Sequence, residues 1–131
     1  PDPLAAFCLS RLGTYRAALL TRRIADSRSL VEAVIAGDAP WPAIGRTLAR
    51  FHVLGVRHAD LNANNILIAA DDSVHVIDWD KGRVDLRQNG WPEAVLARLV
   101  RSLHKEAGGR QNADLEAGIE VMTREYRRKM P

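Results

Sequence analysis

Two short apolar runs separated by a polar turn constrain the fold of this chain more than any other feature. Residues 66–68 read Ile-Leu-Ile, and residues 74–77 read Val-His-Val-Ile after the turn Ala-Asp-Asp-Ser. Such a pattern is typical of a β-hairpin. In an antiparallel hairpin the start of the first strand lies beside the end of the second. The pattern therefore predicts that Asn65 and Asp78 meet at one end, which the loop carrying Asp60 also approaches.

The three side chains predicted to converge, Asp60, Asn65 and Asp78, are all hard oxygen donors. Such donors suit Mg²⁺, which keeps water and substrate phosphates among its ligands, rather than Zn²⁺, which prefers nitrogen and sulfur. An Asp beside such a site can orient or deprotonate an attacking hydroxyl, as phosphoryl transfer requires. Alternatively, Asp60 and Asn65 cap turns and Asp78 ends a strand. The joint spacing favours the catalytic interpretation.

Length and composition indicate one globular domain. The chain has 131 residues, of which 47% are hydrophobic and 27% charged. This is enough to bury a real core. The formal net charge of +3 fits an acidic partner without selecting one. Nucleic acid is disfavoured because aromatic residues are only 5% and do not interleave with basic ones. We expect no spanning helix and no signal peptide.

Cys8 is the single cysteine, so no internal disulfide can form and a reducing compartment is the simpler interpretation. Cys8 lies in an apolar run, and we expect it to be an inert, buried thiol.

The N-terminal part is expected to begin with strands. Residues 5–12 and 14–24 are separated by Gly13 and indicate a strand–turn–strand, although their Ala and Leu content equally allows helix. A break with a helix cap is expected at 25–27, before a helix that ends at Gly37. The apolar residues of that helix are Leu30, Val31, Val34 and Ile35.

Three longer helices are expected in the rest of the chain. The first opens at 40–42 and ends at Gly55, the second runs from 91–92 to 108–109, and the third from about Asp114 to Arg128. Their apolar faces consist of Ile44, Leu48 and Phe51; Val95, Leu96, Leu99, Val100 and Leu103; and Leu115, Ile119, Met122 and Tyr126.

The residues around the hairpin resemble a known family. The run from His58 to Asn65 has the Asp-x-x-x-x-Asn spacing of the catalytic loop of the protein-kinase-like superfamily, and Asp78 matches its metal-binding Asp. The run Ile-Asp-Trp-Asp-Lys-Gly-Arg at 77–83 resembles the lipopolysaccharide kinase family, in particular kinases of 3-deoxy-D-manno-octulosonic acid (Kdo). Residues 20–24 and 99–105, the latter preceded by Trp91, are also similar to this family.

The resemblance implies ATP-dependent phosphorylation of a hydroxyl on the Kdo sugar attached to lipid A. It implies that Asp60 is the catalytic base or positions the hydroxyl, and that Asn65 and Asp78 bind ATP through Mg²⁺. His58, also a catalytic candidate, is expected to be a scaffold residue that packs near Trp79. Such an enzyme would be cytoplasmic and peripheral on the inner membrane, with Kdo–lipid A as its partner.

Four further residues are candidates for substrate binding. Many protein kinases have a Lys at the position of Asn62, which cannot neutralise a phosphate charge. Asp80 replaces the Gly of the usual Asp-Phe-Gly and either adds a carboxylate or caps a turn. Lys81 and Arg83 open a basic, irregular segment at 81–90 that either meets the anionic lipid or is a solvated loop.

Basic residues on the last two helices suggest a membrane surface. Arg98, Arg101 and Lys105 lie opposite the apolar face of their helix, and the last helix ends with a basic run at 124–129. These residues either face anionic lipid or form ordinary solvated helix surface.

The resemblance implies a protein-kinase-like α+β fold, represented mainly by the helical C-terminal lobe with a short active-site β-hairpin. Residues 1–27 would supply the last strands of the N-terminal lobe and the hinge, and residues 28–131 the C-terminal lobe. The sequence contains no Gly-rich loop and no strand Lys paired with a helix Glu, so we expect an incomplete enzyme with little turnover alone. The alternatives are an aminoglycoside- or choline-kinase-like enzyme, and a non-catalytic, pseudokinase-like binding module.

Overall fold

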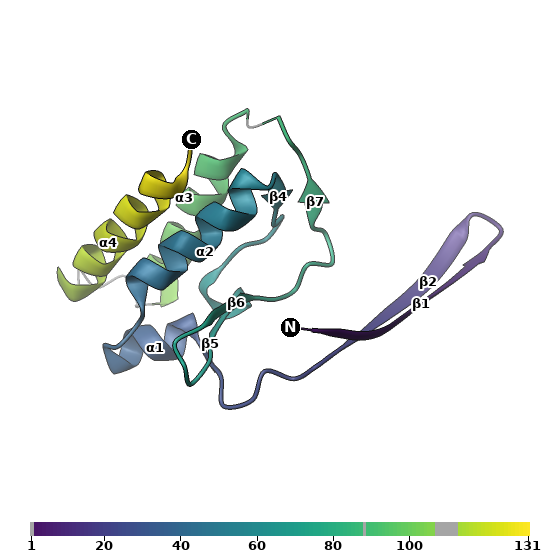
Figure 1. Cartoon of the computed structure of the whole chain (residues 1–131), viewed down its shortest axis with the longest axis horizontal. Helices are drawn as coiled ribbons and strands as arrows, with labels where there is room; N and C mark the ends of the chain where they lie inside the picture. Colours follow the sequence, from purple (N-terminus) through teal and green to yellow (C-terminus); the bar gives the residue numbers. More distant parts are fainter. Residues whose placement is uncertain (1, 88, 107–112) are drawn as a thin grey trace.

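The computed structural model describes residues 2–87, 89–106 and 113–131. These residues form four α-helices, one 3₁₀ helix and seven β-strands (Figure 1). In chain order the elements are β1 (Pro3–Arg11), β2 (Thr14–Thr21), β3 (Arg28–Ser29), α1 (Leu30–Ala36), α2 (Trp41–Val53), β4 (Val56–Arg57), η1 (Ala63–Asn65), β5 (Ile66–Ile68), β6 (Val74–Val76), β7 (Arg83–Val84), α3 (Trp91–Glu106) and α4 (Ala113–Lys129).

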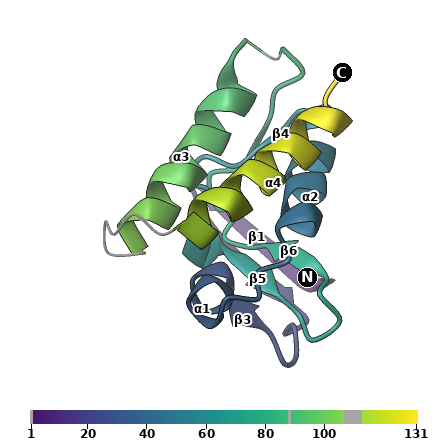
Figure 2. The same cartoon turned by 90° about the vertical axis from the view of Figure 1, so that its left-hand side faces the viewer.

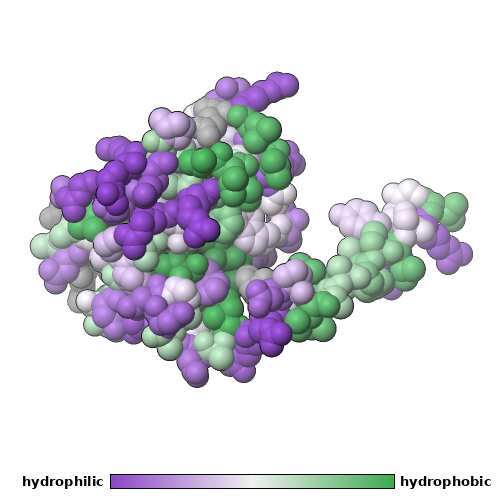
Figure 3. Space-filling model, viewed as in Figure 1, coloured by the Kyte–Doolittle hydropathy of each residue, from purple (hydrophilic) through white to green (hydrophobic). Residues whose placement is uncertain are grey.

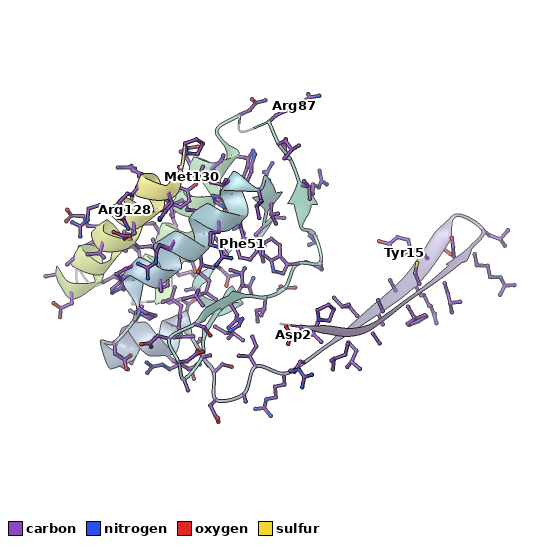
Figure 4. All side chains as sticks on the ribbon, in the orientation of Figure 1. Asp2, Tyr15, Phe51, Arg87, Arg128 and Met130 are labelled. Carbon is purple, nitrogen blue, oxygen red and sulfur yellow. The ribbon has the colours of Figure 1, made fainter. Side chains whose placement is uncertain are left out.

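Strands β1 and β2 form a separate antiparallel arm, which confirms the expected strand–turn–strand. The arm extends away from the helices (Figure 1), and its surface is largely apolar (Figure 3). In the view of Figure 2, turned by 90°, the arm lies behind β5 and β6. Tyr15 lies near its tip (Figure 4). The expectation of a buried Cys8 is wrong, because Cys8 lies on this arm and is exposed. Both strands are exposed almost throughout, so neither face of the arm is covered within the described residues.

The predicted hairpin is confirmed by β5 and β6, which pair antiparallel with Ile66 opposite Val76 and Ile68 opposite Val74. Side chains alternate across a strand, so Ile66 and Ile68 both point into the core, where each is at most 1% exposed. The two-residue strand β3 adds to the other edge of β5. Because the hairpin is held from its buried face, its open end has a fixed position beside the helices.

Helices α2 and α4 pack against each other at two glycines. A Cβ added at Gly45 would lie 2.3 Å from the backbone oxygen of Met122, and one added at Gly118 would lie 2.1 Å from the Trp41 ring. Both distances are far below van der Waals contact, so these positions have room only for glycine. The predicted apolar faces are confirmed by the buried residues Ile44, Leu48, Val95, Leu96, Leu99, Leu103, Leu115, Ile119, Met122 and Tyr126.

The caps of α1 differ partly from expectation. The cap expected at 25–27 is wrong, because Ser29 is the N-cap and its hydroxyl accepts a hydrogen bond from the Glu32 N–H. The Glu32 carboxylate in turn accepts from the Ser29 N–H, which completes a capping box. Gly37 ends the helix at a φ of 76°, as predicted. Ile35 is 77% exposed. The helix end expected at 108–109 lies outside the described residues.

A buried histidine joins three helices in the core. His52 on α2 is 2% exposed, its Nδ1 lies 2.7 Å from the Tyr126 hydroxyl on α4, and its ring meets the edge of Trp91 on α3. Burial lowers the pKa of His52 to about 4, and the nearby Glu93 carboxylate acts in the opposite direction with a smaller effect. Burial also raises the pKa of Tyr126. At neutral pH both groups are therefore uncharged, as an apolar core requires.

Candidate active site

The loop that carries Asp60 is anchored by His58, which is 3% exposed. The Asp60 N–H donates to His58 Nδ1 at 3.1 Å, so Nε2 carries the ring proton and donates to the Ile77 carbonyl at 2.9 Å. The ring also packs on Trp79 with centroids 4.7 Å apart, which confirms the predicted contact. His58 therefore fixes Asp60 relative to the exit of β6. Its role in catalysis stays a prediction.

Two amide side chains hold the backbone of the same loop. The Asn62 side-chain oxygen accepts from the Asn64 and Asn65 N–H groups at 3.0 and 3.2 Å, which makes Asn62 the N-cap of η1. The amide nitrogens of Asn62 and Asn65 both donate to the Asp60 carbonyl, at 3.0 and 3.1 Å. Asn62 thus stabilises the backbone of this loop, and its contact with substrate stays a prediction.

The structure brings Asp60, Asn65 and Asp78 together around one cavity of about 600 Å³. The Ile77 N–H donates to the Asn65 carbonyl at 3.0 Å, which continues the hairpin ladder by one step and sets Asp78 beside the start of β5. Asp78 has a φ of 65°, in the left-handed region that Asp and Asn tolerate better than most residues. Such backbone geometry in a cavity wall is common at functional sites. The roles of the three residues stay predictions.

The donor set of this cavity fits Mg²⁺. The nitrogen end of the Asn65 amide donates to the Asp60 carbonyl, so the oxygen end is the one that can bind a cation. Within the described ranges, no three His, Cys, Asp or Glu side chains are arranged to hold a metal. A cation here would therefore have Asn65 and Asp78 as protein ligands, which suits Mg²⁺ because it retains several waters and substrate phosphates.

Helix α3 forms the opposite wall of the cavity, which the sequence did not reveal. The Arg98 guanidinium forms an ion pair with the Asp60 carboxylate, and the Ser102 hydroxyl accepts from the Ala63 N–H at 3.1 Å. Arg101 and Lys105 also line the cavity. These basic side chains therefore face the site, whereas the sequence suggested a membrane or solvent surface. The sequence signal that could have indicated this wall is that these basic residues and Ser102 share one face of the helix.

The remaining substrate candidates lie outside this cavity. Lys81 and Arg83 line a separate hollow of about 320 Å³ with Arg57, and Asp80 lines two other cavities. The segment at 81–90 is not wholly irregular, because β7 pairs with β4 and puts Arg83 opposite Arg57. Any contact of these residues with substrate stays a prediction.

An apolar cavity of about 920 Å³ adjoins the polar one. Its lining includes Leu19, Phe51, Val76 and Trp79, and the rings of Phe51 and Trp79 pack with centroids 5.0 Å apart. Asp78 lines both cavities. A ligand with an apolar base and a charged tail would find both environments side by side here.

The sequence model of the Lipopolysaccharide kinase (Kdo/WaaP) family matches residues 1–126. The chain belongs to this family. It is 47% identical over 129 residues to a 3-deoxy-D-manno-octulosonic acid kinase of Xanthomonas campestris pv. campestris (strain B100), and 44% identical over 128 residues to one of Stenotrophomonas maltophilia (strain R551-3). Each alignment covers 96% of this chain and 51% of the relative, so the chain spans about half the length of these curated relatives.

Membership of the lipopolysaccharide kinase family implies a protein-kinase-like fold, and the four helices with short strands agree with a mixed α and β class. It also supports the resemblance found around residues 58–83.

Proposed function

We propose that this chain is part of an ATP-dependent kinase that phosphorylates a hydroxyl of the Kdo sugar on lipid A. The names of its relatives support the acceptor. The observation that carries the proposal is the common cavity of Asp60, Asn65 and Asp78, because phosphoryl transfer needs a residue at the nucleophile and oxygen ligands for a metal.

In this proposal Asp60 orients the acceptor hydroxyl and accepts its proton, since it is a carboxylate on a loop fixed by hydrogen bonds at its own N–H and carbonyl. Asn65 and Asp78 hold Mg²⁺. When bound, the ion neutralises charge on the phosphate oxygens. His58 is a positioning residue, because it joins the loop to Ile77 and is not among the described residues that line this cavity.

ATP would use both cavities. We propose that the base occupies the apolar cavity at Phe51 and Trp79, and that the phosphates reach Asp78. Support comes from the position of Asp78, which lines the apolar and the polar cavity.

We propose that residues 1–27 belong to the N-terminal lobe and hinge, and residues 28–131 to the C-terminal lobe. The support is the exposed, apolar β1–β2 arm: Phe7 is 51% exposed, and Leu9 and Leu19 are each 64% exposed. Monomeric proteins rarely leave such a patch uncovered. Further strands of an N-terminal lobe would cover it.

No helix within the described part of the chain is long and apolar enough to cross a bilayer. We propose peripheral contact with the cytoplasmic face of the inner membrane through exposed basic residues at the end of α4, namely Arg124, Arg127 and Lys129. Anionic vesicles should retain the wild-type protein at low salt, and loss of these three charges should weaken retention.

The decisive test uses the natural full-length protein with Mg-ATP and Kdo–lipid A. Wild type should transfer phosphate to Kdo, and Asp60→Ala should lower the rate by about 10²-fold or more. Asp78→Asn should also lower it, since Asn keeps the backbone conformation and removes the charge. Asp72→Asn is the matched control, because Asp72 also has a positive φ, of 61°, and lies in the turn at the far end of the hairpin.

Three results would contradict the proposal: no transfer to Kdo–lipid A, transfer to aminoglycosides or choline in its place, or full activity of Asp60→Ala. Equal losses in Asp72→Asn and Asp78→Asn would contradict the assigned metal role. Circular dichroism of each variant reports whether the fold is intact.

A further inference from the structure

A stripe of basic side chains on α3 faces the cavity. Arg98, Arg101 and Lys105 all line it, and their spacing of three and then four residues places them on one helix face. Seven residues of helix rise by about 10 Å. The α3 stripe, as we name these three residues, therefore extends about two turns along the wall.

The α3 stripe carries positive charge that the protein itself balances only in part. Arg98 is paired with Asp60, whereas Arg101 and Lys105 make no ion pair within the described residues. Glu106 is the one carboxylate that the described part of α3 adds to the lining. An anionic ligand in this cavity would therefore gain from Arg101 and Lys105 without breaking a contact of the protein.

We propose that Arg101 and Lys105 bind the carboxylate of the acceptor sugar acid, an inference that rests on the proposed function. A guanidinium fork matches a carboxylate with two parallel hydrogen bonds. The stripe begins at Arg98, which touches Asp60, so a sugar held by its carboxylate at Arg101 and Lys105 lies along the wall that leads to Asp60.

The α3 stripe fits the acceptor better than the nucleotide. Asn65 and Asp78 lie on the hairpin side of the cavity, so a cation held there would place the phosphates of ATP on that side. The stripe lies on the other wall and extends about two helical turns. A single phosphate beside Asp60 would not reach its far end at Lys105. Asn62 caps η1 and supplies no charge, so α3 is the source of cations in this cavity among the described residues.

The first experiment measures steady-state kinetics of the full-length protein with Arg101→Gln and Lys105→Gln. Each should raise KM for Kdo–lipid A by about tenfold or more, because a hydrogen bond to a charged group is lost. KM for ATP and kcat should stay within about twofold. Arg50→Gln is the matched control, because Arg50 is an exposed arginine on α2 outside this cavity. A rise in KM for ATP alone would assign the stripe to nucleotide phosphate and overturn the inference.

The second experiment identifies the acidic group by equilibrium binding of Kdo–lipid A and of its Kdo methyl ester, without ATP. Wild type should bind the acid about tenfold or more tightly than the ester. The Arg101→Gln/Lys105→Gln double variant should bind both about equally. If the double variant weakens acid and ester alike, the stripe binds lipid A phosphates, and the inference is wrong.

The two experiments also separate this inference from the proposed function. Absence of phosphate transfer by wild type, with the acid–ester preference intact and dependent on the stripe, would refute the kinase proposal alone. Normal transfer with a preference that survives in the double variant would refute the stripe alone. Matching thermal melts of wild type and variants show that the substitutions act locally.

Discussion

His52 should make the stability of the C-terminal helices depend on pH. Its imidazole is buried between α2, α3 and α4, and burial lowers its pKa from 6.5 to about 4. The unfolded chain therefore binds a proton on His52 at a higher pH than the folded chain does. This contribution to stability is fully present above pH 6.5 and is lost as the pH falls toward 4.

The size of the effect follows from the pKa difference. One pKa unit corresponds to about 1.4 kcal/mol, so the free energy of unfolding should fall by about 2 kcal/mol between pH 7 and pH 5, and by about 3 kcal/mol near pH 4. Carboxylates also titrate in this range, so the comparison must isolate His52. The His52→Gln variant does this, because glutamine keeps a polar group beside the Tyr126 hydroxyl but does not titrate.

The assay is urea unfolding at pH 7, 6 and 5, followed by circular dichroism. Wild type should lose about 2 kcal/mol more than His52→Gln over this interval. Tyr126→Phe is the matched control: it removes the hydroxyl that contacts His52, at a cost of about 1 kcal/mol at every pH, but leaves the imidazole buried. Its pH dependence should therefore match that of wild type. Equal pH dependence in wild type and His52→Gln, or an NMR titration of His52 near pH 6.5, would refute the reasoning.

Two further predictions concern stability. Gly45→Ala should destabilise the protein by about 1–2 kcal/mol in urea unfolding although alanine favours helix, because its Cβ would overlap the Met122 backbone oxygen and force α2 from α4; an unchanged or higher stability would contradict this packing. Ser29→Ala should lower the free energy of unfolding by about 1 kcal/mol, because it removes the capping box with Glu32; a Ser29→Asp variant should recover most of the loss, and failure to do so would indicate that the cap contributes little.

The hairpin side of the proposed site could be predicted from the sequence because its geometry is local. Asn65 and Asp78 flank two strands joined by a short turn, so antiparallel pairing alone brings them together. Asp60 precedes the same hairpin by a few residues. The apolar faces of the long helices were also predictable, since each shows a helical period over several turns.

The α3 wall could not be predicted, because its position depends on contacts between distant segments. Arg98 and Asp60 are 38 residues apart, and Ser102 and Ala63 are 39 apart. The chain between them contains β7, which pairs with β4 ahead of Asp60; these strands have only two residues each and show no periodic pattern. A polar helix face has the same sequence pattern whether it faces solvent, lipid or a cavity.

Cys8 and the cap of α1 show two other limits. An apolar run indicates a strand, but whether it is buried depends on what covers it, and nothing within the described residues covers the β1–β2 arm. The cap at Ser29 had a sequence signal, Ser followed by Glu three residues later. The apparent break at 25–27 indicated an earlier start of the helix than the one at Ser29.

The two walls of the cavity differ in what holds them, and this separates two properties of the site. The hairpin and the His58 contact fix Asp60, Asn65 and Asp78 relative to one another. The polar contacts of helix α3 with this unit include the Ser102 hydrogen bond and the Arg98 ion pair, which is exposed and therefore weak, and Leu99 of α3 packs in the same core as Ile66. The arrangement of the proposed metal ligands is thus intrinsic to the hairpin, whereas the distance from the α3 stripe to Asp60 depends on how α3 packs. Differences in α3 and in the segment that leads to it can therefore change the acceptor while the metal site stays the same.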